Sequence, residues 1–244
     1  MSKEHKVAVV TGGTKGLGLG LVKALLSKGY YVYTNFSNNT EQAKKAAQEL
    51  NCINNNYTII QADQSDKVSF KNFINTIRNN ESNVNVIICN TGITCYKPSM
   101  NLTDDDWEKV MMVNVHSHFY LIRDLYNIIP NNSRILFMGS MMGKIPHSSA
   151  LTYGVTKAAI HGLTKNLVKV FEGTGTTVNA LAPGFIDTGW HDGKPSIFFE
   201  RIYNKSAIKR FGTIEEVVNA AMFLIENPFT CGTILDINGG YSCK

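Results

Sequence analysis

The stretch TGGTKGLG at residues 11–18 decides the fold. It follows Val7–Thr11, a continuous apolar run typical of a strand buried on both faces. It leads into Gly16–Lys28, where apolar residues recur at helical spacing. Glycines here let the backbone turn tightly against a pyrophosphate, and the start of a helix offers free N–H donors and a partial positive charge. Because strand, turn and helix occur in the required order, the stretch predicts a dinucleotide-binding turn; the alternative is an ordinary glycine-rich connection.

Strand-like and helix-like segments alternate from this turn to the end of the chain. The predicted strands are Val7–Thr11, Tyr31–Asn35, Tyr57–Ala62, Val84–Cys89, Arg134–Gly139, Thr176–Leu181 and Thr233–Asn238. The predicted helices are Gly16–Lys28, Thr40–Leu50, Asp66–Asn79, Asp104–Ile129, Leu151–Phe171 and Ile214–Glu226. Since each crossover between parallel strands must cover the sheet, this alternation predicts an α/β fold, a doubly wound parallel sheet with helices on both faces. The length of 244 residues suits one domain over residues 1–244, in which the irregular stretch 185–212 is expected to form a substrate lid.

The composition argues against several classes of partner. The 24 Lys and Arg residues are scattered, although the formal net charge is +5, whereas a nucleic-acid-binding protein usually clusters them on one face. No apolar run approaches the roughly 18 residues needed to span a bilayer, and the polar N-terminal residues lack the apolar stretch of a secretory signal. We therefore expect a cytoplasmic protein with no nucleic-acid or membrane partner.

The cysteines indicate neither a metal site nor a disulfide framework. No pair has CxxC spacing, and their number is odd. Free thiols in a reducing compartment are the simplest interpretation, and no metal is expected. The five are Cys52, Cys89, Cys95, Cys231 and Cys243.

The end of the second predicted strand favours NADP over NAD. A site selective for NAD usually has an acidic residue there, on the ribose 2′-hydroxyl, but Thr34–Ser37 contains no carboxylate. Lys15 adds a cation within the phosphate turn, although a solvated surface lysine is the alternative. Asp63 follows the third predicted strand, where it is expected either to accept a hydrogen bond from the adenine amine or to cap a helix.

Four polar residues point to the chemistry. Tyr153 and Lys157 are spaced i, i+4 at the start of a predicted helix, so they share one face. The ammonium is expected to lower the pKa of Tyr153, which then gives a proton to a carbonyl oxygen as hydride reaches the carbon. Ser140 follows the fifth strand, where open α/β sheets place their sites, and its hydroxyl is suited to donate to the same oxygen. Asn114 lies between apolar helix neighbours, which indicates either a kink that holds a water beside Lys157 or a satisfied core asparagine.

Together these pieces resemble the short-chain dehydrogenases/reductases over essentially the whole chain. The resemblance rests on TGGTKGLG (11–18), Asp63, CNTG (89–92), Asn114, Ser140, the pair Tyr153 and Lys157, and PGFIDT (183–188). Within that family the chain looks most like the bacterial 3-oxoacyl-[acyl-carrier-protein] reductases. The similarity to them includes NGG (238–240) and KRFGTIEEV (209–217).

The resemblance implies a Rossmann fold with strand order 3-2-1-4-5-6-7 and NADP(H) as cofactor. It implies that Tyr153 is the general acid, that Lys157 lowers its pKa and binds the ribose, and that Ser140 orients the carbonyl. Asn114 would hold the proton-relay water. Besides Tyr153 and Lys157, the implied cofactor-binding residues are Gly12, Thr14, Lys15, Gly16, Leu17, Gly18, Asn35, Ser37, Asp63, Gln64, Asn90, Gly92, Pro183, Gly184, Ile186 and Thr188. A homotetramer packed through the two long helices and the last strand is also implied.

The implied reaction is NADPH-dependent reduction of a 3-oxoacyl thioester, carried by an acyl carrier protein, in fatty acid or polyketide-type synthesis. However, Asn131 and Thr174 are neutral where the bacterial reductases often have basic residues that dock the carrier. One alternative is a family member that reduces or oxidises a free small ketone or alcohol. Another is a non-catalytic nucleotide-binding subunit, which would be expected to lose part of the catalytic set that is complete here. For the assembly, a heteromer is the alternative to the homotetramer.

Overall fold

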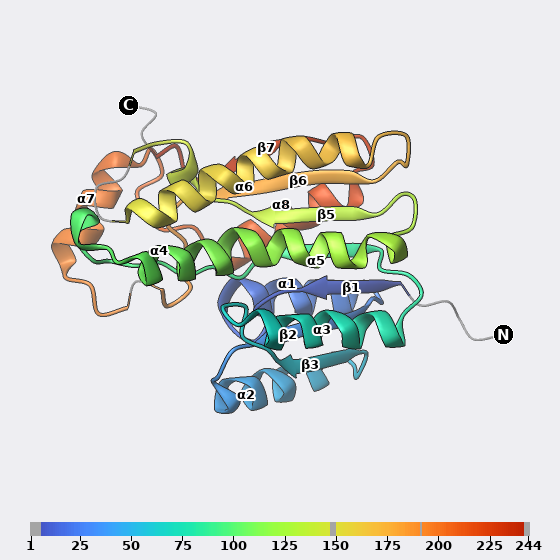
Figure 1. The fold of residues 1–244 in the computed structure, drawn as a ribbon. Coiled ribbons are helices and arrows are strands. Elements are labelled where there is room, and N and C mark those ends of the chain that lie inside the picture. Colours follow the sequence, from blue (N-terminus) through green and yellow to red (C-terminus); the bar gives the residue numbers. More distant parts are fainter. Residues whose placement is uncertain (1–5, 147–149, 191, 242–244) are drawn as a thin grey trace.

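Seven parallel strands form one sheet at the centre of the molecule (Figure 1). The computed structural model describes residues 6–146, 150–190 and 192–241. The strands are β1 (Val7–Val10), β2 (Tyr31–Phe36), β3 (Tyr57–Gln61), β4 (Val86–Cys89), β5 (Arg134–Met138), β6 (Thr177–Pro183) and β7 (Ile234–Ile237). Their order is β3-β2-β1-β4-β5-β6-β7, and all six neighbouring pairs are parallel. The fold class and the strand order expected from the sequence are therefore confirmed.

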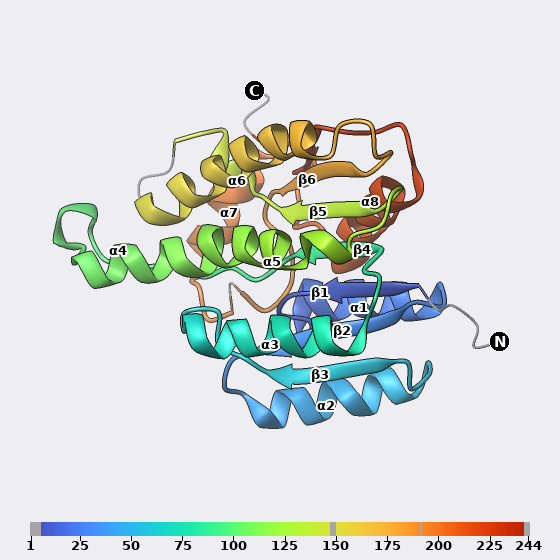
Figure 2. The same cartoon turned by 45° about the vertical axis from the view of Figure 1, so that its right-hand side comes forward.

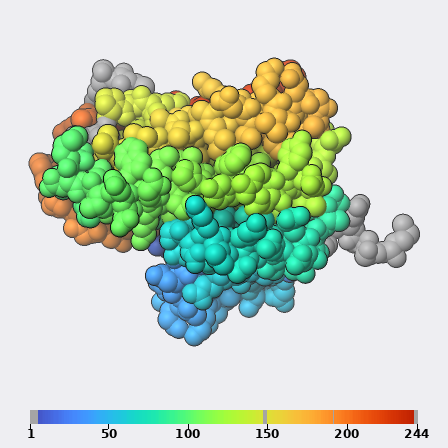
Figure 3. Space-filling view, in the orientation of Figure 1, coloured from blue at the N-terminus to red at the C-terminus, as the bar shows by residue number. Residues whose placement is uncertain are grey.

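Helices cover both faces of this sheet (Figures 1 and 2). The helices are α1 (Gly16–Ser27), α2 (Thr40–Asn51), α3 (Lys67–Asn80), α4 (Asp104–Met111), α5 (Ser117–Leu125), α6 (Leu151–Val170), α7 (Ser196–Lys205) and α8 (Ile214–Glu226). Side chains of α3, α5 and α6 pack on one face of the sheet, and those of α1, α2 and α8 pack on the other. The space-filling view in Figure 3 shows the first of these faces, with α3, α5 and α6 side by side across it.

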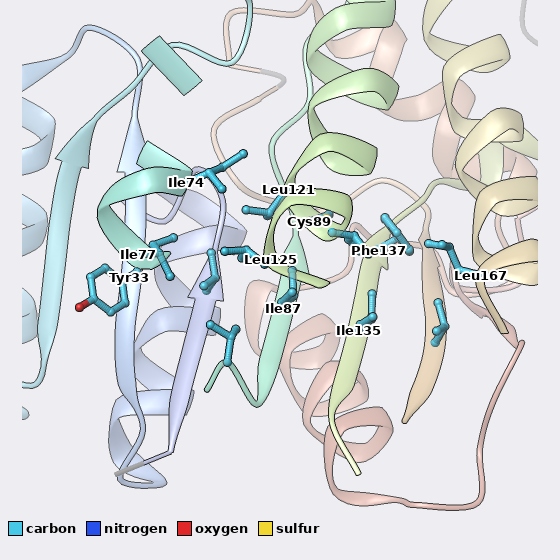
Figure 4. Packing of buried hydrophobic residues seen from close by; sticks show 14 of the residues in the cluster. Tyr33, Ile74, Ile77, Ile87, Cys89, Leu121, Leu125, Ile135, Phe137 and Leu167 are labelled. Atoms are coloured by element: carbon cyan, nitrogen blue, oxygen red, sulfur yellow. The ribbon is translucent and has the colours of Figure 1, made fainter. Parts of the chain in front are cut away.

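Two apolar layers hold the helices to the sheet. Successive side chains of a strand point to opposite faces, so Val7 and Val9 of β1 enter the layer under α3 and α5, while Ala8 and Val10 enter the other. This double burial is why the predicted strands read as continuous apolar runs. Figure 4 shows part of the first layer, in which Leu121 of α5 lies against the central strands.

The main departure from the predicted elements lies in the long helix expected over Asp104–Ile129. The structure divides it into α4, a π-helical turn at Met112–His116, α5 and a 3₁₀ turn at Tyr126–Ile128. A π turn inserts an extra residue into the helical ladder and is often found at functional sites. Asn114 sits in this turn.

The stretch 185–212, expected to form a lid, contains α7 and irregular segments on either side of it. His191 of this stretch and Cys243 lie outside the described residues. The other four cysteines are free thiols, as expected.

None of the helices in the described ranges has both the length and the hydropathy needed to cross a membrane. Within those ranges, the His, Cys, Asp and Glu side chains form no group of three suited to hold a metal ion.

Candidate active site

The turn between β1 and α1 brings the backbone into a shape that only glycine tolerates at several points. Gly12 and Gly16 have φ angles of +67° and +51°, in the left-handed region that side chains disfavour. Gly18 packs directly on the turn, because a Cβ there would lie 2.2 Å from the carbonyl oxygen of Gly12. Helix α1 begins at Gly16, so its N-terminus faces the space above the turn.

Two side chains of β2 hold this turn in place. The backbone N–H of Gly13 donates to Thr34 Oγ1 at 2.8 Å, and that of Gly12 donates to Asn35 Oδ1 at 3.1 Å. Asn35 also donates from Nδ2 to the carbonyl oxygen of Ala62 at 2.8 Å. Asn35, predicted to bind cofactor, is therefore buried and joins the glycine turn to the end of β3.

A cavity of about 250 Å³ opens beside the turn, at the carboxyl ends of β1 and β2. Such a hollow, where the strand order reverses in an open α/β sheet, is the usual seat of a nucleotide. Of the predicted cofactor residues, its walls include Gly12, Asn35, Ser37, Asp63 and Gln64. The cavity and the glycine turn therefore lie together where the adenosine half of a dinucleotide is expected.

Asp63 faces this cavity and is not the helix cap that the sequence left as an alternative. The N-cap of α3 is Asp66, whose side chain accepts from the N–H of Val68 at 2.8 Å. Burial alone would raise the pKa of Asp63, but hydrogen bonds from Ser65 and the charge of Lys109 bring it below its usual value. Asp63 is therefore an ionised acceptor on the wall of the cavity.

The catalytic candidates meet at the carboxyl end of β5. Lys157 is almost fully buried, at 2% exposure, and its Nζ donates to the carbonyl oxygen of Met138 at 2.6 Å. The same Nζ lies 5.4 Å from the centre of the Tyr153 ring. The Ser140 side chain, two residues beyond Met138, lies near enough to the Tyr153 phenol to lower its pKa, and its Oγ accepts from the N–H of Met142 at 3.1 Å. The spacing of these three residues therefore gave the right grouping.

The pKa of Tyr153 differs from the sequence expectation. Burial raises it to about 12, the Ser140 hydrogen bond lowers it less, and the nearby Tyr96 phenol raises it further. Burial also lowers the pKa of Lys157 to about 8. The downward shift predicted for Tyr153 is therefore wrong for this structure, because desolvation of the phenol dominates and the ammonium lies over the ring. At neutral pH Tyr153 is a protonated phenol and thus a proton donor.

Asn114 is held by three hydrogen bonds. Its Oδ1 accepts from the N–H of Ile93 at 2.8 Å, and its Nδ2 donates to the Ile93 carbonyl oxygen at 2.9 Å and to Thr156 Oγ1 at 3.0 Å. These bonds fit the alternative of a satisfied core asparagine and anchor the segment after β4 to the π turn. A Cβ on Gly92 would lie 3.4 Å from Lys157 Nζ and 3.7 Å from Asn114 Oδ1. Gly92 therefore lies next to both polar groups.

The remaining predicted residues lie around this edge of the sheet. Asn90 fastens β4 to β1, since its N–H donates to Thr11 Oγ1 at 2.9 Å and its Nδ2 to the Thr11 carbonyl oxygen at 3.0 Å. Thr188 lies over the first turn, 3.6 Å from where a Cβ on Gly16 would be. Lys15 is exposed at the start of α1, whereas Thr14 is buried.

The other predicted cofactor residues have structural roles that the sequence did not show. Gln64 donates to Ser117 Oγ at 2.8 Å, while its Oε1 is buried with no partner among the described residues. The N–H of Gly184 donates to the carbonyl oxygen of Ile237 at 2.9 Å, which joins the end of β6 to β7. Pro183 ends β6 and Ile186 is buried just beyond it, while Leu17 is partly buried in α1.

Sequence reasoning missed two residues of the site. Lys109 lines the 250 Å³ cavity from α4, and no local motif marks it. His161 follows Lys157 by one helical turn, and its Nε2 would be 2.5 Å from a Cβ on Gly139, just before Ser140. Burial lowers the pKa of His161 to about 4, so a neutral ring supports the strand end that carries Ser140. The spacing of residues 153, 157 and 161 on one helix face was the available signal.

A larger cavity of about 450 Å³ lies outside this arrangement. It is bounded by the ends of β6 and β7 and by the segment before α8. Its volume alone would favour it as a site, but it contains none of Asn114, Ser140, Tyr153 and Lys157. The four predicted catalytic residues therefore lie outside this larger cavity.

The sequence of this chain matches a known protein family. The family described as short chain dehydrogenase matches residues 6–196 of the chain. The chain belongs to the short-chain dehydrogenase family. It is therefore an oxidoreductase by family, and the resemblance inferred from its motifs is confirmed.

Relatives of this short-chain dehydrogenase cover nearly all of its length. The 3-oxoacyl-[acyl-carrier-protein] reductase FabG of Buchnera aphidicola subsp. Baizongia pistaciae is 29% identical, over 98% of each chain. The protein of the same name from Rickettsia prowazekii is 30% identical, over 96% of each chain. Among solved structures, a short-chain dehydrogenase/reductase from Serratia marcescens is 27% identical with a TM-score of 0.90, and covers 97% of this chain and 98% of its own. A blue fluorescent protein from a metagenomic library, solved with NADPH, has the same identity, coverage and TM-score.

Replacing Gly18 by alanine is expected to weaken dinucleotide binding at least tenfold, because the new Cβ would meet the Gly12 carbonyl oxygen at 2.2 Å and displace the turn. Fluorescence titration with NADPH measures this affinity. The control is Gly162→Ala, in a helical position with no atom within 4 Å of the new Cβ, which should leave the affinity unchanged. Equal affinity in Gly18→Ala and the native protein would contradict the role of the turn.

The stability of the protein should rise with pH between about 8 and 10.5. Lys157 has a folded-state pKa of about 8 against a usual value of 10.5, so in this window the unfolded chain binds more protons than the folded one. Above pH 10 the raised pKa of Tyr153 acts in the opposite direction, because the folded state then holds the extra proton. Chemical denaturation of native protein and of Lys157→Met measures the effect, and the rise between pH 8 and 10 should be smaller in the variant. Identical pH profiles would show that burial does not perturb Lys157.

Proposed function

We propose that this protein is an NADPH-dependent ketoreductase that reduces a 3-oxoacyl thioester to the 3-hydroxyacyl form. The observation that carries the proposal is the cluster of Ser140, Tyr153 and Lys157 at the end of β5, beside the glycine turn. The cluster and the turn lie on the same edge of the sheet, so a dinucleotide seated on the turn would extend toward the phenol.

The three side chains have distinct roles in this reduction. The hydroxyl of Ser140 donates a hydrogen bond to the substrate carbonyl oxygen and holds it beside Tyr153. Bound NADPH supplies the hydride that the carbonyl carbon accepts. Tyr153 gives its phenolic proton to the oxygen, which becomes the hydroxyl of the product. Its raised pKa keeps it protonated at neutral pH between turnovers.

Lys157 is proposed to connect Tyr153 to the water that returns its proton. A buried ammonium with three N–H donors is suited to bind ribose hydroxyls while it keeps the bond to Met138. Its charge then favours the phenolate that Tyr153 becomes after the transfer. A water held between Lys157 and Asn114 would return the proton, and the closeness of Gly92 to both side chains supports this relay.

The choice of NADPH over NADH rests on the residues around the ribose. Ser37 directly follows β2, where an NAD-selective enzyme has a carboxylate, and the exposed Lys15 is the N-cap of α1. We expect a 2′-phosphate bound there to meet the Ser37 hydroxyl and the Lys15 ammonium, which would offset the ionised Asp63 on the wall of the same cavity. Solved relatives bound to NADPH support the same choice.

The thioester substrate is supported by the names of the curated relatives, which are 3-oxoacyl-[acyl-carrier-protein] reductases at 29% and 30% identity. One observation favours a second candidate, a free small ketone. Asn131 is exposed and Thr174 partly exposed at the positions where basic residues would dock an acidic carrier, and both are neutral. The complete catalytic set weighs against a non-catalytic subunit.

We also propose a homotetramer in the cytoplasm, packed through α4–α5, α6 and β7. Exposed apolar side chains on these helices support the assembly, since such patches often mark protein contacts. They include Phe119 and Tyr126 on the α4–α5 face, and Leu151, Val155 and Val170 on α6.

Replacing Tyr153 by phenylalanine should reduce turnover at least a hundredfold and leave NADPH affinity nearly unchanged, because only the proton donor is lost. NADPH oxidation is followed with acetoacetyl thioester, carrier-bound and as the N-acetylcysteamine analogue, beside a panel of free ketones. Activity of the native protein on free ketones alone would favour the second candidate. Unchanged turnover in Tyr153→Phe would remove Tyr153 from the mechanism.

Replacing Lys15 by alanine should weaken NADPH binding about tenfold and NADH binding much less, because only NADPH has the 2′-phosphate that the ammonium would meet. Lys23→Ala is a matched control, since Lys23 is also in α1 but pairs with Glu49. Dissociation constants for both dinucleotides give the comparison. Equal losses for the two would rule out a 2′-phosphate contact at Lys15.

A further inference from the structure

The Ser140 turn, residues 140–144, is short and internally hydrogen-bonded. Ser140 is the N-cap of a 3₁₀ turn at Met141–Gly143, and Lys144 is its C-cap. The N–H of Gly143 donates to the Ser140 carbonyl oxygen at 3.0 Å, and that of Lys144 donates to the Met141 carbonyl oxygen at 2.9 Å. Because these bonds close successive positions of one turn, a shift of Lys144 is passed on to Ser140.

Helix α6 packs directly against the Ser140 turn. A Cβ on Gly143 would lie 2.7 Å from the Lys157 carbonyl carbon and 2.8 Å from both the Ala158 nitrogen and His161 Cε1. Real Cβ atoms essentially never come this close to other heavy atoms, so only glycine lets the turn approach the helix in this way. Packing of this kind resists movement of the turn toward the helix. Movement away from the helix is resisted only by an attractive contact.

Lys144 supplies an attractive contact, and its partners lie on β7. Its Nζ donates to Asp236 Oδ1 at 2.8 Å, to Asp236 Oδ2 at 2.7 Å and to the Ile234 carbonyl oxygen at 3.1 Å. Lys144 and Asp236 are 92 positions apart in the chain. An ammonium has three N–H donors, and here each has an acceptor on the same strand. The Ser140 turn is thereby attached to the last strand of the sheet.

This attachment joins two strands that are not neighbours, because β6 lies between β5 and β7. Ile234 packs against the apolar layer under α6, and side chains two residues apart on a strand point to the same face. Asp236 therefore points to the face of the sheet that carries α6, on which the Ser140 turn packs. The side chains of Lys144 and Asp236 are 34% and 46% exposed. Replacing either one leaves no buried charge, so the variants should fold.

We propose that Lys144 and Asp236 are a positioning pair that holds the Ser140 hydroxyl where it can orient the substrate carbonyl. This inference rests on the proposed ketoreductase function and adds two residues that act through Ser140 rather than on the substrate. The glycine turn that would seat the dinucleotide is held separately, by Thr34 and Asn35 of β2. Loss of the pair should therefore slow turnover without weakening NADPH binding.

The main test is a double-mutant cycle on the reduction of acetoacetyl-N-acetylcysteamine, with Lys144→Met, Asp236→Ala and the two changes together. Methionine keeps most of the length of the lysine side chain but removes its charge and its N–H donors. Because a small displacement of a catalytic group is costly, each single change should lower kcat about tenfold and leave KM for NADPH within about twofold. The double variant should also fall about tenfold, and not about a hundredfold, because both changes remove the same contact.

Two further variants sharpen the cycle. Lys144→Arg keeps the charge and the donors, so it should retain about half of the native kcat or more. Lys28→Met is the matched control, because Lys28 also pairs with a distant carboxylate, that of Glu226 at 2.6 Å. Lys28 is the C-cap of α1, at the end away from the glycine turn, and its replacement should leave kcat unchanged. Losses that multiply in the double variant, or equal falls in kcat and NADPH affinity, would overturn the proposal.

A second readout needs no turnover. Hydrogen exchange of backbone amides, followed by mass spectrometry, reports how readily a segment opens. Peptides that cover residues 139–146 should exchange about fivefold faster in Lys144→Met than in the native protein, because the turn has lost its attachment to β7. The same peptides should exchange at the native rate in Lys28→Met. Equal exchange of this segment in Lys144→Met and the native protein would contradict the attachment.

The outcomes separate the positioning pair from the proposed function. If the native protein reduces free ketones but no thioester, the same cycle is measured on a ketone. A loss of kcat shared by the single and double variants there would mean that the thioester assignment fails and the pair stands. If the native protein reduces the thioester and Lys144→Met reduces it at the native rate, the function stands and the pair fails.

Discussion

The bond from the Lys157 ammonium to the carbonyl oxygen of Met138 fixes the centre of the site. A buried ammonium is costly unless it has a strong acceptor, and the end of β5 provides one at 2.6 Å. This bond ties α6 to the strand two residues before Ser140. It therefore sets the proposed acid, Tyr153, relative to the hydroxyl proposed to orient the substrate. Tyr153 lies on the same helix, one turn before Lys157. Burial raises its pKa to about 12 and makes it a donor that keeps its proton.

The parallel sheet accounts for the rest of the arrangement. The carboxyl ends of its parallel strands all lie at one edge. Residues that follow different strands are therefore close in space, although they are far apart in the sequence. Asn90 joins β4 to β1 and Asn35 joins the glycine turn to β3, both through hydrogen bonds to backbone. Asn114, in the π turn, joins that turn to the segment after β4 through hydrogen bonds to the backbone of Ile93. Most polar side chains around the expected cofactor space therefore hold the backbone in place. The fixed backbone in turn positions the few side chains that are proposed to act chemically.

Much of the fold could be predicted from the sequence. Strands buried on both faces need continuous apolar runs, and the first turn requires glycine. The grouping of Ser140, Tyr153 and Lys157 followed from their places at a strand end and on one helix face. Other features depend on tertiary contacts that leave no local pattern. The sequence could not show that desolvation outweighs the ammonium at Tyr153, or that Lys109 reaches the cavity from α4. Nor did it show that Lys144 reaches Asp236, since the turn after β5 and the last strand must both fold before the pair exists.

A crystal structure of the protein with NADP⁺ would test the central claim most directly. The account predicts the pyrophosphate on the turn at residues 12–18, the ribose hydroxyls within hydrogen-bond distance of Lys157 Nζ, and the nicotinamide facing the Tyr153 hydroxyl. A dinucleotide bound in the 450 Å³ cavity near β7, or a Tyr153 hydroxyl turned away from the nicotinamide, would contradict it.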